Sequence, residues 1–311
     1  MQPSTEWAEV IGVDEQSRHA AFTEQIVRLQ SRINAKKGPG RAFHRKPIAG
    51  LRGTLQVPDL LPDYAAQGLF AKPGQHEVVV RMSNGAVVPA PDAMPDVRGF
   101  AFSVRGVSGP CARGRPTDRQ DFLLINFPNF GFEDSRDFAD IVGPAARGQV
   151  ALLRFLIGKF GPVQGPLQMA QLVAHQARPF SGFATTAFHS CAPVAWGPYA
   201  AQVHVEPVGA ARNLLAWRDF GADIESRLQR GPLTWRVQAQ FYTDDRSTPI
   251  EDGRVTWASE KVTVATLVCD DLVDVEGDRF DPWNALTDHQ PLGEIMRARK
   301  VAYFPSFQNR T

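Results

Sequence analysis

Cysteines, long apolar runs and excess charge are all scarce in this sequence. The three cysteines, Cys111, Cys191 and Cys269, lie far apart and form no CxxC pair, which argues against a disulfide framework and a zinc site. The longest apolar stretch, residues 150–160, contains charged residues and is too short to span a bilayer. With 34 Lys and Arg against 33 Asp and Glu, the chain as a whole has no field that attracts nucleic acid or an anionic membrane. We therefore expect a small-molecule substrate, no nucleic-acid partner and no membrane span.

The sequence also lacks a charged-then-apolar signal pattern at residues 1–14, and no linker, repeat or low-complexity segment stands out. These absences predict a cytoplasmic location and a single domain over residues 1–311. The 24 prolines and 26 glycines separate short apolar runs, which is typical of a β-rich fold with many turns.

Two periodicities divide the chain into helices and strands. Phe22, Ile26 and Ile33 recur at helical spacing, so the sequence predicts an N-terminal amphipathic helix over about residues 14–37. Runs with strand character lie at residues 51–57, 77–82, 99–104, 122–125, 199–205, 235–242 and 261–268. Further helical patterns lie at about residues 135–142, 150–160, 167–176, 224–229 and 292–303. Because long helical segments separate the strands without βα alternation, we predict an α+β fold, an antiparallel β-barrel with surrounding helices.

Some positive charges stand where apolar residues are expected. Arg81 and Arg98 lie inside strand-like apolar runs, and a buried guanidinium needs an anion to offset its desolvation. A dianionic ligand would supply one. Residues 36–46, which include His44, form a basic cluster, although such a cluster is commonly a solvated turn.

Arg299 and Tyr303 stand four residues apart in the last predicted helix. That spacing puts both side chains on one face, so the guanidinium can lie against the phenol oxygen and favour its ionised form. A tyrosinate can bind ferric haem iron. The alternative is an exposed helix on which an aromatic ring packs against an arginine stem.

Four short segments carry a resemblance to a known family: Arg41-Ala-Phe-His44, Arg81-Met-Ser83, Arg98-Gly-Phe-Ala101 and Arg299-x3-Tyr303-x6-Arg310. They occur in the same order, and at similar intervals, as the haem-site motifs of the haem catalases. Residues 280–293 also resemble the approach to the proximal helix in the small members. Over about residues 35–311 the chain thus resembles the short, catalase-related haem proteins. The resemblance implies a barrel of catalase type and a haem b (iron protoporphyrin IX) cofactor.

The resemblance assigns one group of residues to haem binding. Tyr303 matches the proximal tyrosine that binds the iron. Arg299 matches the arginine that keeps this phenol ionised. The arginines that bind the haem propionates correspond to Arg41, Arg81 and Arg310.

A second group is assigned to the distal side of the haem. His44 matches the histidine that takes a proton from a bound hydroperoxide and returns it to the leaving oxygen. Ser83 matches the serine that fixes the tautomer of this histidine. Phe130 or Phe132 could supply the aromatic plane over the haem face, although simple core packing is the more common role of such a residue.

One expected residue is missing from its place. Catalases carry an asparagine before the fourth strand to orient peroxide, whereas residues 117–121 contain none. Gln120 could substitute as an amide donor. The nearest asparagine, Asn126, lies at the far end of the predicted strand. This departure puts efficient dismutation of hydrogen peroxide in doubt.

We therefore expect a haem-dependent peroxidase that acts on hydrogen peroxide, and possibly on organic hydroperoxides, with a small-molecule reductant and weak catalase activity. Full catalases continue beyond the tyrosine through a wrapping segment and a helical domain, so a more open pocket and a simpler homo-oligomer, a dimer, are expected. One alternative is rearrangement of a fatty-acid hydroperoxide, as in the allene oxide synthases that share this fold. Another is a haem or hydrophobic-ligand carrier without turnover, which would not need His44.

Overall fold

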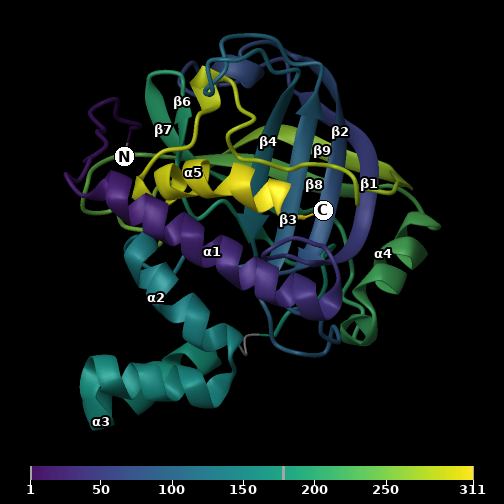
Figure 1. The fold of residues 1–311 in the computed structure, drawn as a ribbon. Coiled ribbons are helices and arrows are strands. Elements are labelled where there is room, and N and C mark those ends of the chain that lie inside the picture. Colours follow the sequence, from purple (N-terminus) through teal and green to yellow (C-terminus); the bar gives the residue numbers. More distant parts are fainter. Residues whose placement is uncertain (1, 177–178, 311) are drawn as a thin grey trace.

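A closed ring of eight antiparallel strands forms the centre of the computed structural model, which describes residues 2–176 and 179–310 (Figure 1). The strands in chain order are β1 (Lys46–Val57), β2 (Gly74–Asn84), β3 (Arg98–Arg105), β4 (Arg119–Ile125), β5 (Phe188–His189), β6 (Val194–Trp196), β7 (Tyr199–Pro207), β8 (Leu233–Phe241) and β9 (Lys261–Leu272). The sheet order is β5-β4-β3-β2-β1-β9-β8-β7, and pairing of β5 with β7 closes the ring, while β6 pairs with β7 beside it. The predicted antiparallel barrel is confirmed.

Five α-helices surround this barrel: α1 (Glu15–Lys37), α2 (Ser135–Ala146), α3 (Gln149–Gln176), α4 (Phe220–Leu228) and α5 (Glu294–Gln308). The predicted N-terminal helix corresponds to α1, whose buried residues include Phe22, Ile26 and Ile33. The two helices predicted at residues 150–160 and 167–176 are the two limbs of α3, which is broken at Gly161 (φ 87°, ψ 171°). None of the helices in the described part of the chain is long and apolar enough to cross a bilayer.

The alternation of side chains along β2 separates the core from the site. Val80 and Met82 are fully buried in the apolar core of the barrel. Because successive side chains of a strand point to opposite faces, Arg81 and Ser83 lie together on the outer face. Ser83 pairs with Gly99 of β3, so the beginning of β3 borders the same outer surface.

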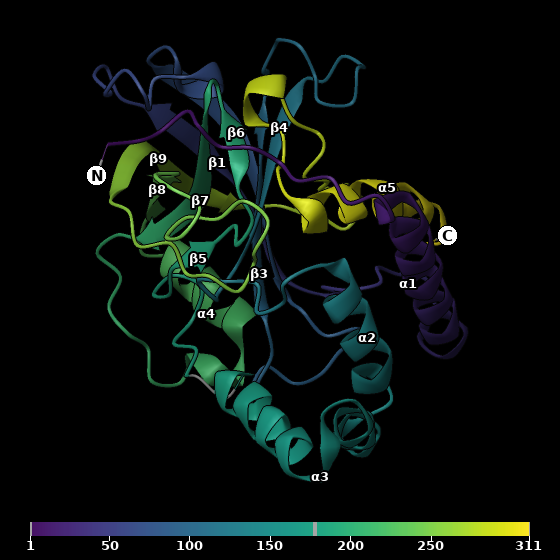
Figure 2. The same cartoon turned by 90° about the vertical axis from the view of Figure 1, so that its left-hand side faces the viewer.

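Helices α1 and α5 lie side by side outside the barrel (Figures 1 and 2). The side chain of Gln30 donates to the carbonyl of Ser306 at 3.0 Å, and Asn34 Nδ2 donates to the carbonyl of Asn309 at 2.7 Å. These contacts fix the C-terminal half of α5 against α1. The helix that carries Tyr303 is therefore positioned by α1.

Candidate active site

Helix α5 brings Arg299 and Tyr303 into contact. The helix begins after Gly293, whose backbone amide donates to the carboxylate of Glu9 at 2.8 Å. Arg299 Nη2 donates to Tyr303 Oη at 2.5 Å, and the guanidinium carbon lies 5.3 Å from the centre of the phenol ring. The contact predicted from the four-residue spacing is present.

His44 lies on the turn before β1, where three separate segments meet. Its backbone is left-handed (φ 52°), and its amide donates to the carbonyl of Gly85 at 3.0 Å. Its Nδ1 is 3.1 Å from Ser83 Oγ. On the neighbouring strand, a Cβ at Gly99 would lie only 2.5 Å from Nδ1. The ring is thus held between β2 and β3, and Ser83 has the contact predicted for it.

Three arginines predicted to bind an anion share one region. Arg81 Nη2 donates to the carbonyl of His44 at 2.7 Å, and Arg41 Nη2 donates to the carbonyl of Asp278 at 2.7 Å. Burial, followed by the charges of Arg41 and Arg310, lowers the pKa of Arg81 to about 9. Burial and the charge of Arg41 likewise lower the pKa of Arg310 to about 10. The three groups remain charged at neutral pH and repel one another, so an anion placed among them would be strongly stabilised.

Burial, together with the same charges, keeps His44 neutral. Burial, Arg81, Arg299 and Arg41, in that order, lower the pKa of His44 from 6.5 to about 3. When Nδ1 carries the ring hydrogen it donates to Ser83 Oγ, and Nε2 is then able to accept a proton. A neutral imidazole with an oriented ring is the state that a general base requires.

Phe130 and Phe132 belong to an aromatic cluster beside this turn. Their ring centres are 5.4 Å apart, and each is within 5.4 Å of the ring of Phe138 on α2. Phe43, next to His44 in the chain, lies 5.8 Å from Phe138. The structure therefore brings both predicted phenylalanines to the neighbourhood of the site, where they pack on one another.

The prediction for Gln120 was wrong. Gln120 is buried on β4, and its side-chain oxygen accepts from the amide of Leu286 at 2.8 Å. It pairs with Val104, whereas Gly99 beside His44 pairs with Ile125. Five strand residues separate these positions, or about 16 Å at ~3.3 Å per residue. The amide of Gln120 supports the other end of the barrel.

The same strand register brings Asn126 to the site. β3 and β4 are antiparallel, so the far end of β4 lies beside Gly99 at the beginning of β3. Asn126 Oδ1 accepts from the amide of Arg98 at 2.7 Å, and the amide of Asn126 donates to the carbonyl of Arg98 at 3.1 Å. Asn126 was not predicted as a site residue because it lies at the far end of the predicted strand. The signal that could have identified it is antiparallel pairing, which brings the end of one strand beside the beginning of its neighbour.

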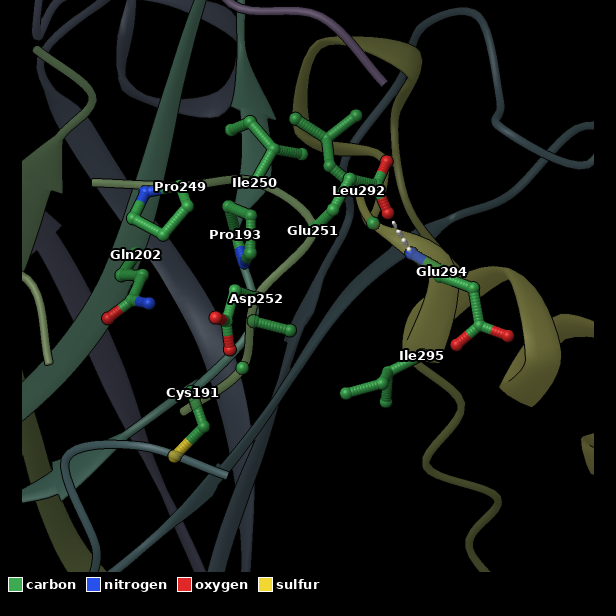
Figure 3. A pocket seen from close by; sticks show the side chains of 13 residues that line it. Cys191, Pro193, Gln202, Pro249, Ile250, Glu251, Asp252, Leu292, Glu294 and Ile295 are labelled. Atoms are coloured by element: carbon green, nitrogen blue, oxygen red, sulfur yellow. Dashed lines mark hydrogen bonds between the residues drawn. The ribbon is translucent and has the colours of Figure 1, made fainter. Parts of the chain in front are cut away.

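A small hollow lies at the beginning of α5 (Figure 3). Its lining includes Cys191, Gln202 and Asp252. The side-chain oxygen of Gln202 is buried there without a hydrogen bond, and burial raises the pKa of the Cys191 thiol. Its last lining residue on α5 is Ile295, eight residues before Tyr303, or about 12 Å along a helix. It offers no activated nucleophile.

Comparison with known proteins identifies the architecture. No protein-family model and no curated protein matches the sequence. Solved structures do match: a fungal catalase with a TM-score of 0.70 at 17% identity, and catalase A from Saccharomyces cerevisiae with a TM-score of 0.71 at 18% identity. A bacterial catalase matches with a TM-score of 0.67 at 18% identity. The chain has the catalase fold.

The match covers most of this chain but only part of the catalases. It covers 90% of this chain in each case, and 60%, 63% and 59% of the fungal, yeast and bacterial proteins. The chain thus spans about three fifths of the length of the catalases it matches. Within this catalase fold, His44 comes from the turn before β1 and Tyr303 from α5.

Proposed function

We propose that this protein binds haem b through Tyr303 and uses it to act on peroxides, with His44 as the general base. One observation carries the proposal: a phenol bonded to Arg299 and a neutral histidine share a single set of arginines. A phenolate ligand and a proton acceptor are the two groups that peroxide chemistry at haem iron needs from the protein. The catalase fold supports this assignment at the level of architecture.

The residues present fit haem. Its two propionates would offset the charges of Arg41, Arg81 and Arg310, and planar guanidinium groups suit carboxylates. The buried Nε atoms of Arg81 and Arg310 have no hydrogen-bond partner within the part of the chain that the structure describes. Among the described residues, no group of three or more His, Cys, Asp or Glu side chains could hold a metal.

When bound, the haem iron supplies the redox chemistry that splits a peroxide O–O bond. The chain itself moves the proton. His44 takes it from the inner oxygen of a hydroperoxide and returns it to the leaving oxygen, which assists the cleavage. Ser83 fixes the ring, and Arg81 holds the His44 backbone through its carbonyl.

The position of Asn126 bears on which peroxide reaction follows. The preference for a peroxidase with weak catalase activity depended on the lack of an amide near His44. With Asn126 at the end of β4 that borders Gly99, an amide is available to orient peroxide. We therefore propose both peroxide reduction by small donors and dismutation, and their ratio is the quantity to measure.

The remaining alternatives receive less support. Rearrangement of a fatty-acid hydroperoxide requires a long apolar channel, which apolar side chains such as Val88, Phe132 and Leu156 would have to line together. Leu156 is buried in α3, where Gly165 of the other limb packs against its backbone. Phe132 lies in the aromatic cluster with Phe138. A carrier without turnover would not require the oriented, neutral His44. The single domain over residues 1–311, the cytoplasmic location and a homodimer stay predictions.

The proposal is tested by the absorption spectrum of the purified protein, with and without added haem. We expect a Soret band of tyrosinate-ligated, high-spin iron that Tyr303→Phe loses or alters, while the matched variant Tyr199→Phe in β7 retains it. An identical spectrum and haem content in Tyr303→Phe would rule out this ligand. Peroxide consumption that survives unchanged in His44→Ala would rule out the proposed base.

A further inference from the structure

Helix α3 forms a hairpin that extends away from the barrel. In Figures 1 and 2 it lies at the lower edge of the molecule, next to α2 and apart from the strands. Its two limbs meet closely, since a Cβ at Gly165 would lie 2.6 Å from the backbone nitrogen of Ile157. Lys159 joins the hairpin to α2 through Asp137 and Asp140. The two limbs of the hairpin therefore pack closely and are attached to α2, but the hairpin does not cover the proposed site.

The hairpin exposes large apolar side chains on both limbs. Leu156 is buried, but six others are at least a third exposed: Val150, Ile157, Phe160, Val163, Leu167 and Val173. Val163 is 69% exposed and Leu167 51% exposed. A gathering of exposed apolar side chains on one element marks a surface that contacts another partner.

The hairpin itself carries charge of one sign, and its acidic neighbours on α2, Asp137 and Asp140, pair with Lys159. Residues 141–205 contain no Asp or Glu, although the whole chain has 33 of them. The same stretch contains Arg147 and Arg154, both exposed, together with Lys159. Although the net charge of the whole chain is close to zero, this stretch is therefore apolar and basic. Apolar side chains flanked by basic ones suit the interface of an anionic bilayer.

We propose that the α3 hairpin docks on an anionic lipid surface and places Val163 and Leu167 in the boundary between headgroups and acyl chains. A second copy of this chain fits less well, because a symmetric contact would place basic residues against basic residues with no acid in the hairpin to compensate. The hairpin lies on the surface rather than crossing it, in agreement with the lack of a spanning helix in the described residues. The inference goes beyond the proposed peroxide chemistry and does not depend on it.

The test is flotation of the purified full chain with vesicles of phosphatidylcholine and phosphatidylserine, compared with phosphatidylcholine alone. We expect binding to the anionic vesicles that weakens as salt is raised. The double variant Val163→Glu/Leu167→Glu should bind at least about tenfold more weakly, because each residue loses its apolar transfer into lipid and gains a repelled charge. The control Leu60→Glu/Leu214→Glu changes two residues that are 89% and 84% exposed outside the hairpin, and it should bind like the wild type.

Melting curves and gel filtration of all three proteins complete the experiment. Because the changed side chains are exposed, the melting temperatures should agree. Absence of wild-type binding, or equal loss in the control variant, would overturn the proposal. So would a wild-type dimer that Val163→Glu/Leu167→Glu converts to a monomer without any vesicle binding, since a second copy would then cover the hairpin. None of these results depends on haem or on peroxide turnover.

Discussion

Gly99 has no side chain, and the His44 ring occupies the space that a side chain at this position would fill. A Cβ at this position would lie 2.5 Å from Nδ1 and 2.6 Å from Cε1 of His44, and 2.9 Å from Ser83 Oγ. Glycine is required here by close approach, not by a left-handed backbone. The orientation of the histidine thus depends on a residue without a side chain on the next strand.

Gly99→Ala should therefore displace the His44 ring without removing it. We expect peroxide consumption to fall by about 10²-fold, as for other small misplacements of reacting groups, while haem content stays close to that of the wild type. Stopped-flow measurement of the reaction with hydrogen peroxide gives the rate. Gly74→Ala is the matched control, because nothing lies within 4 Å of its added methyl. Equal rates for the wild type and Gly99→Ala would show that the His44 ring tolerates the added methyl group, and would contradict the prediction.

Acid should destabilise the protein in part through His44. Its pKa is lowered to about 3 in the folded chain from the ordinary 6.5, so the unfolded chain binds the proton more readily. This contribution to stability is complete above about pH 6.5 and is lost as the pH falls toward 3. Between about pH 7 and about pH 5, the melting temperature of the wild type should fall further than that of His44→Gln. The lowered pKa values of His189, His204 and His289 act in both proteins; parallel curves would contradict the prediction.

Replacing Arg310 should separate stability from cofactor binding. Burial and the charge of Arg41 lower its pKa to about 10, so Arg310→Met removes a repelled charge and retains the length of the side chain. We expect the haem-free variant to melt at a higher temperature than the haem-free wild type, and to bind haem more weakly. Calorimetry and haem titration measure the two quantities. A variant that is less stable without haem would show that Arg310 is satisfied by the protein itself.

Arg299 should support ligation by the tyrosine. Arg299→Leu removes the donor to Tyr303 Oη, so the bond between this oxygen and the iron should weaken. Absorption spectra recorded across mildly acidic to alkaline pH follow this change. Arg299→Lys keeps the charge without the planar fork and should lie between the two. If all three proteins gave the same spectra throughout, the charge on Arg299 would have no part in ligation.

Asn126→Asp tests the residue that the register brings to His44. The substitution keeps an oxygen that can accept from the Arg98 amide but replaces the amide donor with a negative charge. Oxygen release from hydrogen peroxide should decrease more than oxidation of a phenolic donor, because orienting a second peroxide depends on a donor. Asn129→Asp, in the loop after β4, serves as the control. An unchanged ratio of the two reactions would exclude Asn126 from the chemistry.

Local patterns in the sequence predicted most of the barrel and one side of the site. The strand at residues 51–57 and the contact of Arg299 with Tyr303 each follow from short-range periodicity. The two-residue strand β5, which closes the ring, has no such pattern, because its existence depends on partners in β4 and β7. Gln120 and Asn126 were misplaced for a related reason: which end of a strand reaches the site is decided by its pairing.

The distance in sequence between His44 and Tyr303 has a consequence for biosynthesis. At ~5–20 residues per second, the roughly 260 residues between them take on the order of tens of seconds to translate. The barrel cannot close before β9 pairs with β1, and α5 is made only after β9. During that interval Arg41 and Arg81 are already in a chain that still lacks Tyr303. A cofactor held by Tyr303 is therefore received only after the barrel strands have been synthesised, and not by the first strands to emerge.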